Sequence, residues 1–447
     1  MTLGRPDIAG MNPPGHLQYI SRLAKTQRYI VQQCLSGAAQ PWCYHTQFSY
    51  HLQITNLVAP LFFKALQSVV RRHPIMRTVF FDRGDGQIWQ GIDPALELAV
   101  QFYDINRQAA GQHDEWIRRF LLADRDRPFD LLNGEAALVR AFMIKRSTET
   151  LQLVLVFHHA IWDGWSLAVL VKEIFDVYQT LRTSPTLSLH PAAYDYQDFI
   201  SDELSERHSA EAMRFWAEHL RDHHEYRIER QFSDADLEAY EPVHCMLDAD
   251  LVARLEQCAR RQRVTMKSLF VALFVYMIHD ESQQSHATIG MVSNGRSIRL
   301  KSPLTTLGLL WNLAPLCVET DPLANNLTDH IRSVHHALAD TAAFCDYPLV
   351  DILKDRGVDQ LFHAAFNYID FGSANIVRKD SGIRFLDSGG LDKFHFPLHL
   401  LVGRNPFDRN ISLVLNFDSR CYSAQQIRSK LGRYLERLQQ WCGENCA

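Results

Sequence analysis

Residues 151–167 read LQLVLVFHHAIWDGWSL, and this stretch joins a strand pattern to a helix pattern through a polar turn. The segment 151–157 is almost unbroken in Leu and Val, which predicts a strand buried on both faces. Apolar residues at helical spacing begin just after Gly164 and continue to about Leu181. His158 and His159 therefore lie at the end of a rigid strand, a position where catalytic side chains often occur.

The residue types in this turn suit proton transfer better than metal binding. His158 and His159 point to opposite faces of a strand, so only one of them can face a given cavity. Adjacent strand histidines are poor joint ligands, and no further ligand follows at the usual spacing, so we expect no metal. A free imidazole titrating near neutral pH can move a proton. Asp163 could orient the histidine ring or pair with an arginine. Gly164 allows the backbone to bend sharply, and Ser166 is expected to cap the following helix.

The composition of the whole chain limits the possible classes of protein. Its 447 residues suit two domains of about 200 residues each, and the net charge of −5 gives no reason to expect nucleic acid. Nine cysteines, an odd number without C-x-x-C pairs, favour a reducing compartment over a disulfide framework. The N-terminus has no signal-peptide pattern, and the apolar runs are too short to span a bilayer. We expect a cytoplasmic monomer without a membrane partner.

The periodicity alternates between helix and strand along the whole chain, which predicts an α/β protein. Expected helices include 17–34, 113–122, 166–181, 209–220, 250–262, 265–280, 324–343 and 423–441, and expected strands include 48–54, 137–145, 287–292, 361–369 and 411–417. The Ser-, Thr- and Pro-rich segment Thr183–His190 is the best candidate for a boundary. We therefore predict two α/β halves, residues 1–182 and 183–447, that share a site between them.

The turn also resembles a family signature. His158-His159-Ala160-Ile161-Trp162-Asp163-Gly164 looks like the H-H-x-x-x-D-G motif of the condensation domains of nonribosomal peptide synthetases. The shorter H-x-x-x-D core is shared with chloramphenicol acetyltransferase and plant acyl-CoA acyltransferases, and the glycine favours condensation over epimerisation domains. Further segments resemble family motifs in the same order: Leu23–Arg28, Arg72–Phe80, Pro128–Leu131, Tyr196–Phe199, Phe215-Trp216, Gly295-Arg296 and Leu307–Leu316.

The resemblance implies both a fold and an activity. The fold would be two chloramphenicol acetyltransferase-like lobes that form a V-shaped pseudo-dimer with a tunnel at their junction. Carrier proteins would present substrates on phosphopantetheine arms, and the enzyme would bind no cofactor of its own. It would join an acyl or peptidyl thioester to an amine or hydroxyl acceptor, which is either carrier-bound or a free small molecule. We expect a free-standing enzyme.

The resemblance also implies roles for individual residues. His159 would take or hold the proton of the acceptor, or stabilise the cationic tetrahedral intermediate. A backbone N–H near Gly164 would bind the oxyanion. Asp163 would form an ion pair, with Arg296 as the first choice of partner and Arg77 as the second. Asn312 would line the tunnel near His159.

One departure concerns the K-F-D-L motif of the family, where this chain has Lys393-Phe394-His395-Phe396. The histidine at the aspartate position indicates either an unusual acceptor or a change on the surface.

Two other functions stay open: an acyl-CoA-dependent acyltransferase of the same fold, and an inactive docking platform, against which the intact motif argues. For a carrier protein, the densest basic clusters are Arg260-Arg261-Gln262-Arg263 and the helix with Arg428, Lys430 and Arg433, although both also suit plain solvated helix faces.

Overall fold

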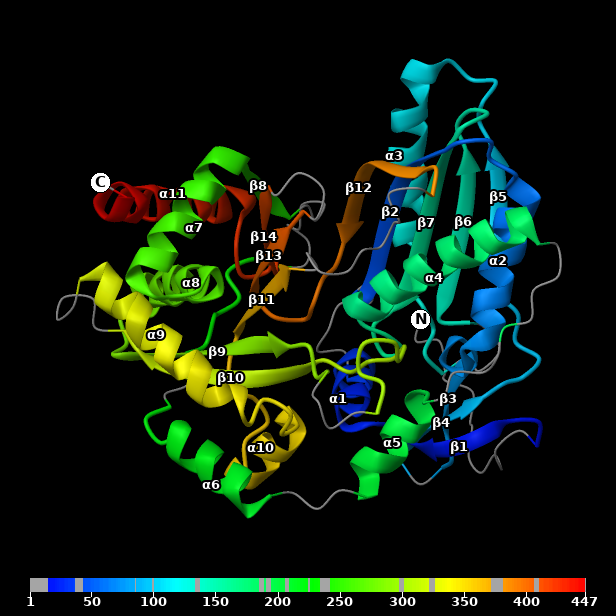
Figure 1. Cartoon of the computed structure of the whole chain (residues 1–447). Coiled ribbons are helices and arrows are strands. Elements are labelled where there is room, and N and C mark those ends of the chain that lie inside the picture. The colour runs from blue at the N-terminus through cyan, green and yellow to red at the C-terminus, as the bar shows by residue number, and fades with distance from the viewer. Residues whose placement is uncertain are drawn as a thin grey trace. The chain divides into compact units, whose positions relative to one another are not determined.

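A computed structural model of the chain divides into two compact units (Figure 1). Unit 1 is formed within residues 1–206, 296–310 and 375–395, and unit 2 within residues 207–295, 311–374 and 396–447. The structure describes residues 15–36, 43–84, 86–98, 100–132, 137–184, 189, 194–205, 209–223, 226–233, 242–296, 301–320, 326–370, 381–405 and 410–446.

The predicted domain division stays a prediction. Most of the proposed boundary segment Thr183–His190 lies outside the described residues. Unit 1 takes two segments from the second half of the sequence, so the compact units do not follow a single cut in the chain. The predicted V shape and tunnel likewise stay predictions, whereas the predicted α/β class is confirmed in both units.

The main sheet of unit 1 has the strand order β12-β2-β7-β6-β5. Its strands are β2 (His45–Ile54), β5 (Val100–Asp104), β6 (Val139–Lys145), β7 (Thr150–His158) and β12 (Ile383–Leu391). β7 lies between β2 and β6, and every residue of it after Thr150 is buried, as the apolar run predicts. β12 comes from far along the chain and pairs antiparallel with β2, which brings the segment after Leu391 to this sheet.

The remaining elements of unit 1 are a small sheet and the helices. The small sheet, in the order β1-β4-β3, contains β1 (Gln18–Arg22), β3 (Thr78–Asp82) and β4 (Ile88–Ile92). The helices are α1 (Lys25–Leu35), α2 (Ala59–Arg72), α3 (His113–Arg125), α4 (Gly164–Thr183) and α5 (Tyr196–Ser205), with short 3-10 turns at Pro74–Arg77 and Ala110–Gln112. The helix predicted from residue 17 is wrong at its start, because residues 18–22 pair with β4 as a strand.

Unit 2 is built on a sheet with the strand order β10-β9-β11-β13-β14-β8. Its strands are β8 (Val243–Leu247), β9 (His286–Ser293), β10 (Asn312–Glu319), β11 (Ala364–Asp370), β13 (Leu398–Arg404) and β14 (Ile411–Phe417). Its helices are α6 (Ala210–His219), α7 (Ala249–Gln262), α8 (Met266–Ser282), α9 (Leu327–Ala342), α10 (Leu349–Arg356) and α11 (Ala424–Cys446).

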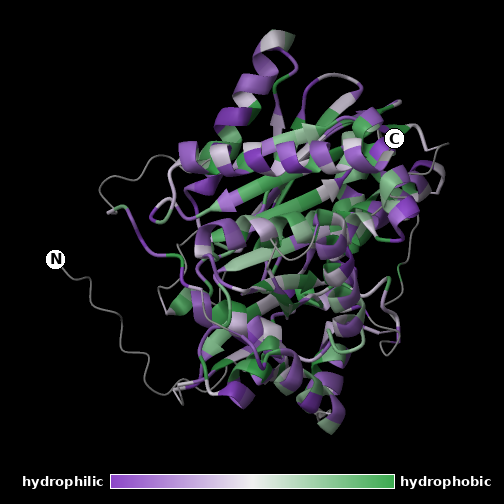
Figure 2. Ribbon diagram, turned by 90° about the vertical axis from the view of Figure 1, so that its left-hand side faces the viewer, coloured by the Kyte–Doolittle hydropathy of each residue, from purple (hydrophilic) through white to green (hydrophobic). Residues whose placement is uncertain are grey.

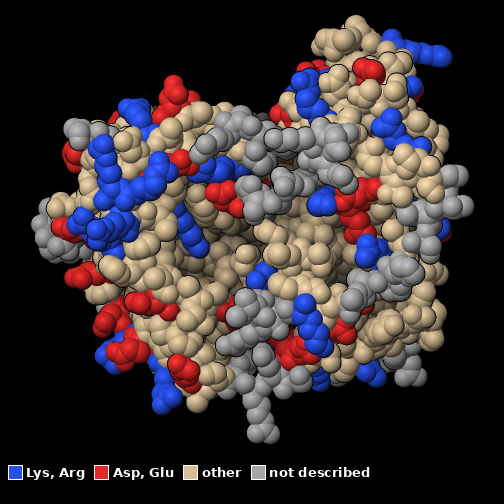
Figure 3. Space-filling view, in the orientation of Figure 1, with Lys and Arg blue, Asp and Glu red and all other residues tan. Residues whose placement is uncertain are grey.

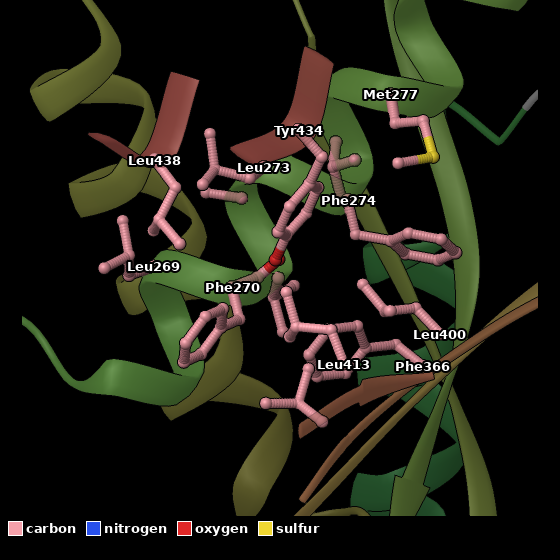
Figure 4. Close-up of a cluster of buried hydrophobic side chains, with 14 of the residues drawn as sticks. Leu269, Phe270, Leu273, Phe274, Met277, Phe366, Leu400, Leu413, Tyr434 and Leu438 are labelled. Carbon is pink, nitrogen blue, oxygen red and sulfur yellow. The ribbon is translucent and has the colours of Figure 1, made fainter. Parts of the chain in front are cut away.

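The core of unit 2 centres on α8, which is apolar around most of its circumference and therefore buried. Phe270 and Phe274 of this helix pack with Leu400 and Leu413 of the sheet (Figure 4). The Tyr434 hydroxyl of α11 donates to the Phe270 carbonyl at 2.9 Å. In Figure 2 the long strands are green for most of their length, while many helices alternate green and purple. Within the described residues, no helix is long and apolar enough to cross a membrane.

A buried ion pair fixes the turn after β7. An Arg296 guanidinium nitrogen lies 2.9 Å from Asp163 Oδ1 and 3.2 Å from Oδ2, and the two side chains are 1% and 4% exposed. Asp163 is also the N-cap of α4, because its Oδ1 accepts from the backbone N–H of Ser166 at 2.7 Å. The predicted pairing with Arg296 is confirmed.

The same ion pair binds the segment 301–310 to the turn. Arg296 donates to the carbonyls of Pro303 and Thr306, and the backbone N–H of Leu310 donates to Asp163 Oδ2 at 3.1 Å. Gly308 in this segment lies against the ring of Tyr196, which would overlap a Cβ atom at that position. A segment distant in sequence is thereby packed against the start of α4.

We expect Asp163→Ala to lower the free energy of unfolding by about 3–5 kcal/mol, because Arg296 is left as a buried, unpaired charge. Asp176→Ala on the same helix is the matched control, since Asp176 pairs with Lys172 at an exposed site where the loss is below about 1 kcal/mol. Thermal and urea unfolding measure both values. A fully stable but inactive Asp163→Ala variant would instead place Asp163 in the chemistry.

Candidate active site

The two histidines are held by backbone bonds at the end of β7. His158 lies opposite His45 of β2, and its N–H donates to the Leu138 carbonyl at 3.0 Å. The N–H of His159 donates to the Tyr44 carbonyl at 2.8 Å. The chain then turns, since the N–H of Ile161 donates to the His158 carbonyl. The backbone of both histidines is therefore fixed by neighbouring strands and by the turn itself.

The ring of His159 is buried and has a partner at each nitrogen. Its Nδ1 lies 3.0 Å from the carbonyl oxygen of Trp162, and its Nε2 lies 2.9 Å from Asp392 Oδ1. The whole residue is only 2% exposed. A carbonyl oxygen can only accept, so Nδ1 must carry a hydrogen. The predicted free imidazole is wrong, because its second nitrogen contacts a carboxylate.

Asp392 sets the charge of the His159 ring. Burial lowers the pKa of His159, but the negative charge of Asp392 and its hydrogen bond raise it, as do the Trp162 carbonyl and Asp163. The net result is a pKa above the ordinary histidine value. Asp392 Oδ1 also accepts from the hydroxyl of Thr46 at 3.1 Å. The carboxylate is thus held in position by a second donor from β2.

His158 has the opposite electrostatic surroundings. Burial, followed by the charges of His159 and His45, lowers the pKa of His158 to about 3. Its Nδ1 accepts from the N–H of Ala160 at 3.1 Å, and its Nε2 lies 3.7 Å from the sulfur of Cys34. His158 is therefore neutral under ordinary conditions, and these contacts support the turn.

The segment 392–395, which follows β12, packs against the His159 ring. Phe394 stacks on the ring with centroids 5.5 Å apart and an interplanar angle of 15°. The carbonyl of Lys393 accepts from the N–H of Tyr44 at 2.7 Å. His395 Nδ1 lies 2.6 Å from the Tyr44 hydroxyl, and its Nε2 lies 3.3 Å from the Tyr29 hydroxyl. The idea that His395 is a surface change is therefore wrong.

Two of the other family-like segments support the turn from behind. Gln27 of α1 donates through Nε2 to the Ala160 carbonyl at 2.9 Å. The segment Leu23–Arg28, which resembles the first family motif, therefore contacts the turn at residues 158–164 directly. Phe129, from the P-F-D-L segment, lies with its ring 6.3 Å from that of His158 and beneath the guanidinium of Arg140.

The other predicted site residues have structural partners. Ser166 does not cap α4, because Asp163 does; its hydroxyl lies 2.8 Å from the Gly308 carbonyl and 3.0 Å from Arg296. Gly164 is the first residue of α4, and it is not among the glycines with a left-handed backbone. Arg77 does not contact Asp163 and donates instead to two carbonyls at the end of α2.

Asn312 belongs to unit 2, where it organises a loop. Its amide nitrogen donates to the carbonyls of Cys345 and Tyr347, at 2.9 and 2.7 Å, and its oxygen accepts from the N–H of Leu349. These bonds fix the segment that leads into α10. Its predicted position beside His159 stays a prediction.

The sequence reasoning missed Asp392, Thr46 and Tyr44. The departure from the family pattern at His395 lies in the segment 392–395, which packs against the His159 ring. Nothing in the spacing of residues indicates that Asp392 of this segment contacts His159, 233 residues earlier in the chain. Such a contact depends on β12 pairing with β2. In the part of the chain that the structure describes, no group of three or more His, Cys, Asp and Glu residues could hold a metal ion.

The arrangement as a whole can hold and release one proton at a defined atom. Nδ1 of His159 is committed to a carbonyl, so proton exchange must take place at Nε2 beside Asp392. The ring is fixed by stacking and the turn by the Asp163–Arg296 pair, so Nε2 is held in a defined position.

The chain is similar to parts of two much longer synthases. The chain is 27% identical over 323 residues to one of the plipastatin synthase proteins of Bacillus subtilis (strain 168), and the match covers 69% of this chain but 12% of that protein. It is 22% identical over 383 residues to gramicidin S synthase 2 of Aneurinibacillus migulanus, covering 83% of this chain and 8% of that protein. The chain thus spans about a tenth of the length of these relatives.

Solved structures share the fold. A mutant of the starter condensation domain of rhizomide synthetase RzmA aligns over 96% of this chain and 95% of its own, with a TM-score of 0.80 and 15% identity. The condensation domain of the monacolin K polyketide synthase MokA aligns over 97% and 99%, with a TM-score of 0.77 and 16% identity. The family model of the condensation domain matches residues 18–444, and the chain therefore belongs to the condensation domain family.

Proposed function

We propose that this chain transfers an acyl or peptidyl group from the phosphopantetheine thioester of a carrier protein to an amine acceptor, forming an amide. The observation that carries the proposal is the His159 ring, which is fixed at the end of β7 with Nε2 as its proton-exchanging atom. Membership of the condensation domain family supports the same reaction. The enzyme needs no bound cofactor for it, because aminolysis of a thioester is already downhill.

In the proposed reaction the acceptor nitrogen attacks the thioester carbonyl carbon. A C–N bond forms, the C–S bond breaks, and the proton lost by the nitrogen passes to Nε2 of His159 and then to the departing thiolate. One proton moves and no oxidant or reductant is consumed. A backbone N–H near Gly164 is proposed to bind the oxyanion. Alignment of the two substrates supplies the rest of the acceleration.

A coenzyme A thioester is the second candidate donor. The RzmA starter condensation domain was solved in complex with C8-CoA and Leu-SNAC, so a relative of the same fold binds an acyl-CoA. The two donors are distinguished by incubating the enzyme with an amine and either acylated carrier protein or acyl-CoA alone. Intact-protein mass spectrometry follows loss of the acyl group from the carrier, and product mass reports the amide.

We expect His159→Ala to lower the condensation rate by about 10²–10⁴-fold, because no other group at the site exchanges a proton at that position. Since the ring is buried against Asp392, we also expect a lower melting temperature, so rates are compared well below the transition. His244→Ala, at an exposed histidine of β8, is the control and should keep full activity. More than about a third of the wild-type rate in His159→Ala would refute the role.

Carrier recognition is proposed to use basic residues of α7 and α11, which gather on one face of unit 2 (Figure 3). Arg260 is exposed, with 72% of its side chain accessible. Lys430 is unsuitable, because it is largely buried and lies 2.7 Å from Glu281. The remaining basic positions are Arg260, Arg261, Arg263, Arg428 and Arg433, of which Arg260, Arg263, Arg428 and Arg433 are taken as test positions.

We expect the double reversals Arg260→Glu with Arg263→Glu, or Arg428→Glu with Arg433→Glu, to slow the reaction with a carrier-bound donor. The rate with a small soluble thioester should stay nearly unchanged, because the site chemistry is untouched. Added salt should have the same selective effect, since exposed charges are screened. Arg107→Glu in unit 1 is the matched control. Equal losses with both donors would show damage to the fold and would exclude this surface.

A further inference from the structure

We propose that Asp392 is a positioning residue that shares one proton with Nε2 of His159 and thereby decides when that nitrogen can act as a base. The inference rests on the proposed function and adds a residue outside the H-H-x-x-x-D-G turn. It is carried by the 2.9 Å contact between Nε2 and Asp392 Oδ1, by the burial of His159 beside a carboxylate that is only 14% exposed, and by the fixed partner at Nδ1.

The hydrogen-bond inventory of the pair limits its protonation states. Because the Trp162 carbonyl requires a hydrogen on Nδ1, the contact at Nε2 can contain a proton only on the nitrogen or on the carboxylate. Without that proton, a lone pair of Nε2 would face a carboxylate oxygen at 2.9 Å. The pair therefore retains one proton more readily than an isolated imidazole does.

The pair is held in place from both sides. The Asp392 side chain is 14% exposed and that of His159 is 3% exposed, so water competes little for the contact. Thr46 donates to the same carboxylate oxygen from β2. Phe394, two residues after Asp392, stacks on the imidazole, so one short segment orients the ring and supplies its charge.

Other titratable groups near His159 differ in effect, and the buried Lys393 is the neighbour of Asp392 in the chain. Asp163 contributes a further negative charge, but it is neutralised by Arg296. Tyr44 lies edge-on to the ring with centroids 6.4 Å apart, and burial raises its pKa well above the ordinary tyrosine value, so it stays neutral. His158 is neutral because burial lowers its pKa to about 3. Asp392 is the carboxylate in direct contact with the ring.

The consequence is a specific dependence on pH. As a base, His159 acts only after the shared proton has left, so the rate of the wild-type enzyme should rise with pH above the ordinary histidine range. In Asp392→Asn the negative charge is absent while burial remains, and burial alone favours the neutral ring. In the plot of kcat/KM against pH, the rise should then move to lower pH by at least about one unit. The value of kcat/KM at the plateau should fall about tenfold or more, because the ring is a weaker and less well oriented base.

The test measures kcat/KM against pH for the wild type, Asp392→Asn and two controls. Thr46→Val removes the second hydrogen bond to Asp392 but keeps the charge of Asp392. The pH at which kcat/KM rises should therefore stay close to the wild-type value. Asp387→Asn makes the same substitution on β12, at an exposed position, and should leave the profile unchanged. The proposal would be overturned if kcat/KM rose at the same pH in Asp392→Asn as in the wild type, or if Thr46→Val moved the rise by as much as Asp392→Asn does.

A second measurement does not depend on turnover. In protein with 15N-labelled histidine, the His159 ring signals, assigned by their loss in His159→Gln, report the protonation of each nitrogen during a pH titration. We expect a higher pKa in the wild type than in Asp392→Asn, with Nδ1 protonated throughout. Equal titration in both proteins would refute the shared proton. A displaced titration with a rate that falls as pH rises would support the pair and reject only the general-base role.

Discussion

The buried ion pair between Asp163 and Arg296 is the interaction on which the rest of the site depends. A buried ion pair is stable only when further hydrogen bonds satisfy both charged groups. Here the Asp163 carboxylate also accepts from the backbone N–H groups of Ser166 and Leu310. The same group therefore caps α4, ends the turn after β7 and binds a distant segment. Loss of this pair would disturb the turn after His158, the start of α4 and the segment 301–310.

The geometry of His159 follows from that anchored turn. A buried imidazole with one nitrogen committed to a carbonyl has a single site for proton exchange, and in this chain a carboxylate occupies it. The pKa of the ring is then the balance of burial, which lowers it, and the Asp392 charge, which raises it. Two adjacent histidines differ in charge for the same reason, since His158 has no carboxylate at either ring nitrogen among its described contacts.

The departure from the family pattern near residue 395 belongs to this same balance. The segment after β12 brings Asp392 and Phe394 to the His159 ring, and His395 to two buried tyrosines. The relatives show that the fold tolerates identities near 15% across nearly the whole chain. The contacts of His159 in this chain therefore have to be read from its own structure, because so low an identity shows a shared fold only.

The sequence by itself determined the α/β class and the buried strand β7 through local periodicity. It determined the turn with His159 and the partnership of Asp163 with Arg296 only through the resemblance of these segments to family motifs. Only the tertiary structure decided that residues 18–22 form a strand, that Asp163 and not Ser166 caps α4, and that Asp392 contacts His159. Each of these depends on a partner far away in the chain: β4 for the strand, the segment 301–310 for the hydroxyl of Ser166, and the pairing of β12 with β2 for Asp392. Local patterns report the preferences of a segment, whereas the contacts of its side chains are set by whichever distant segment packs against it.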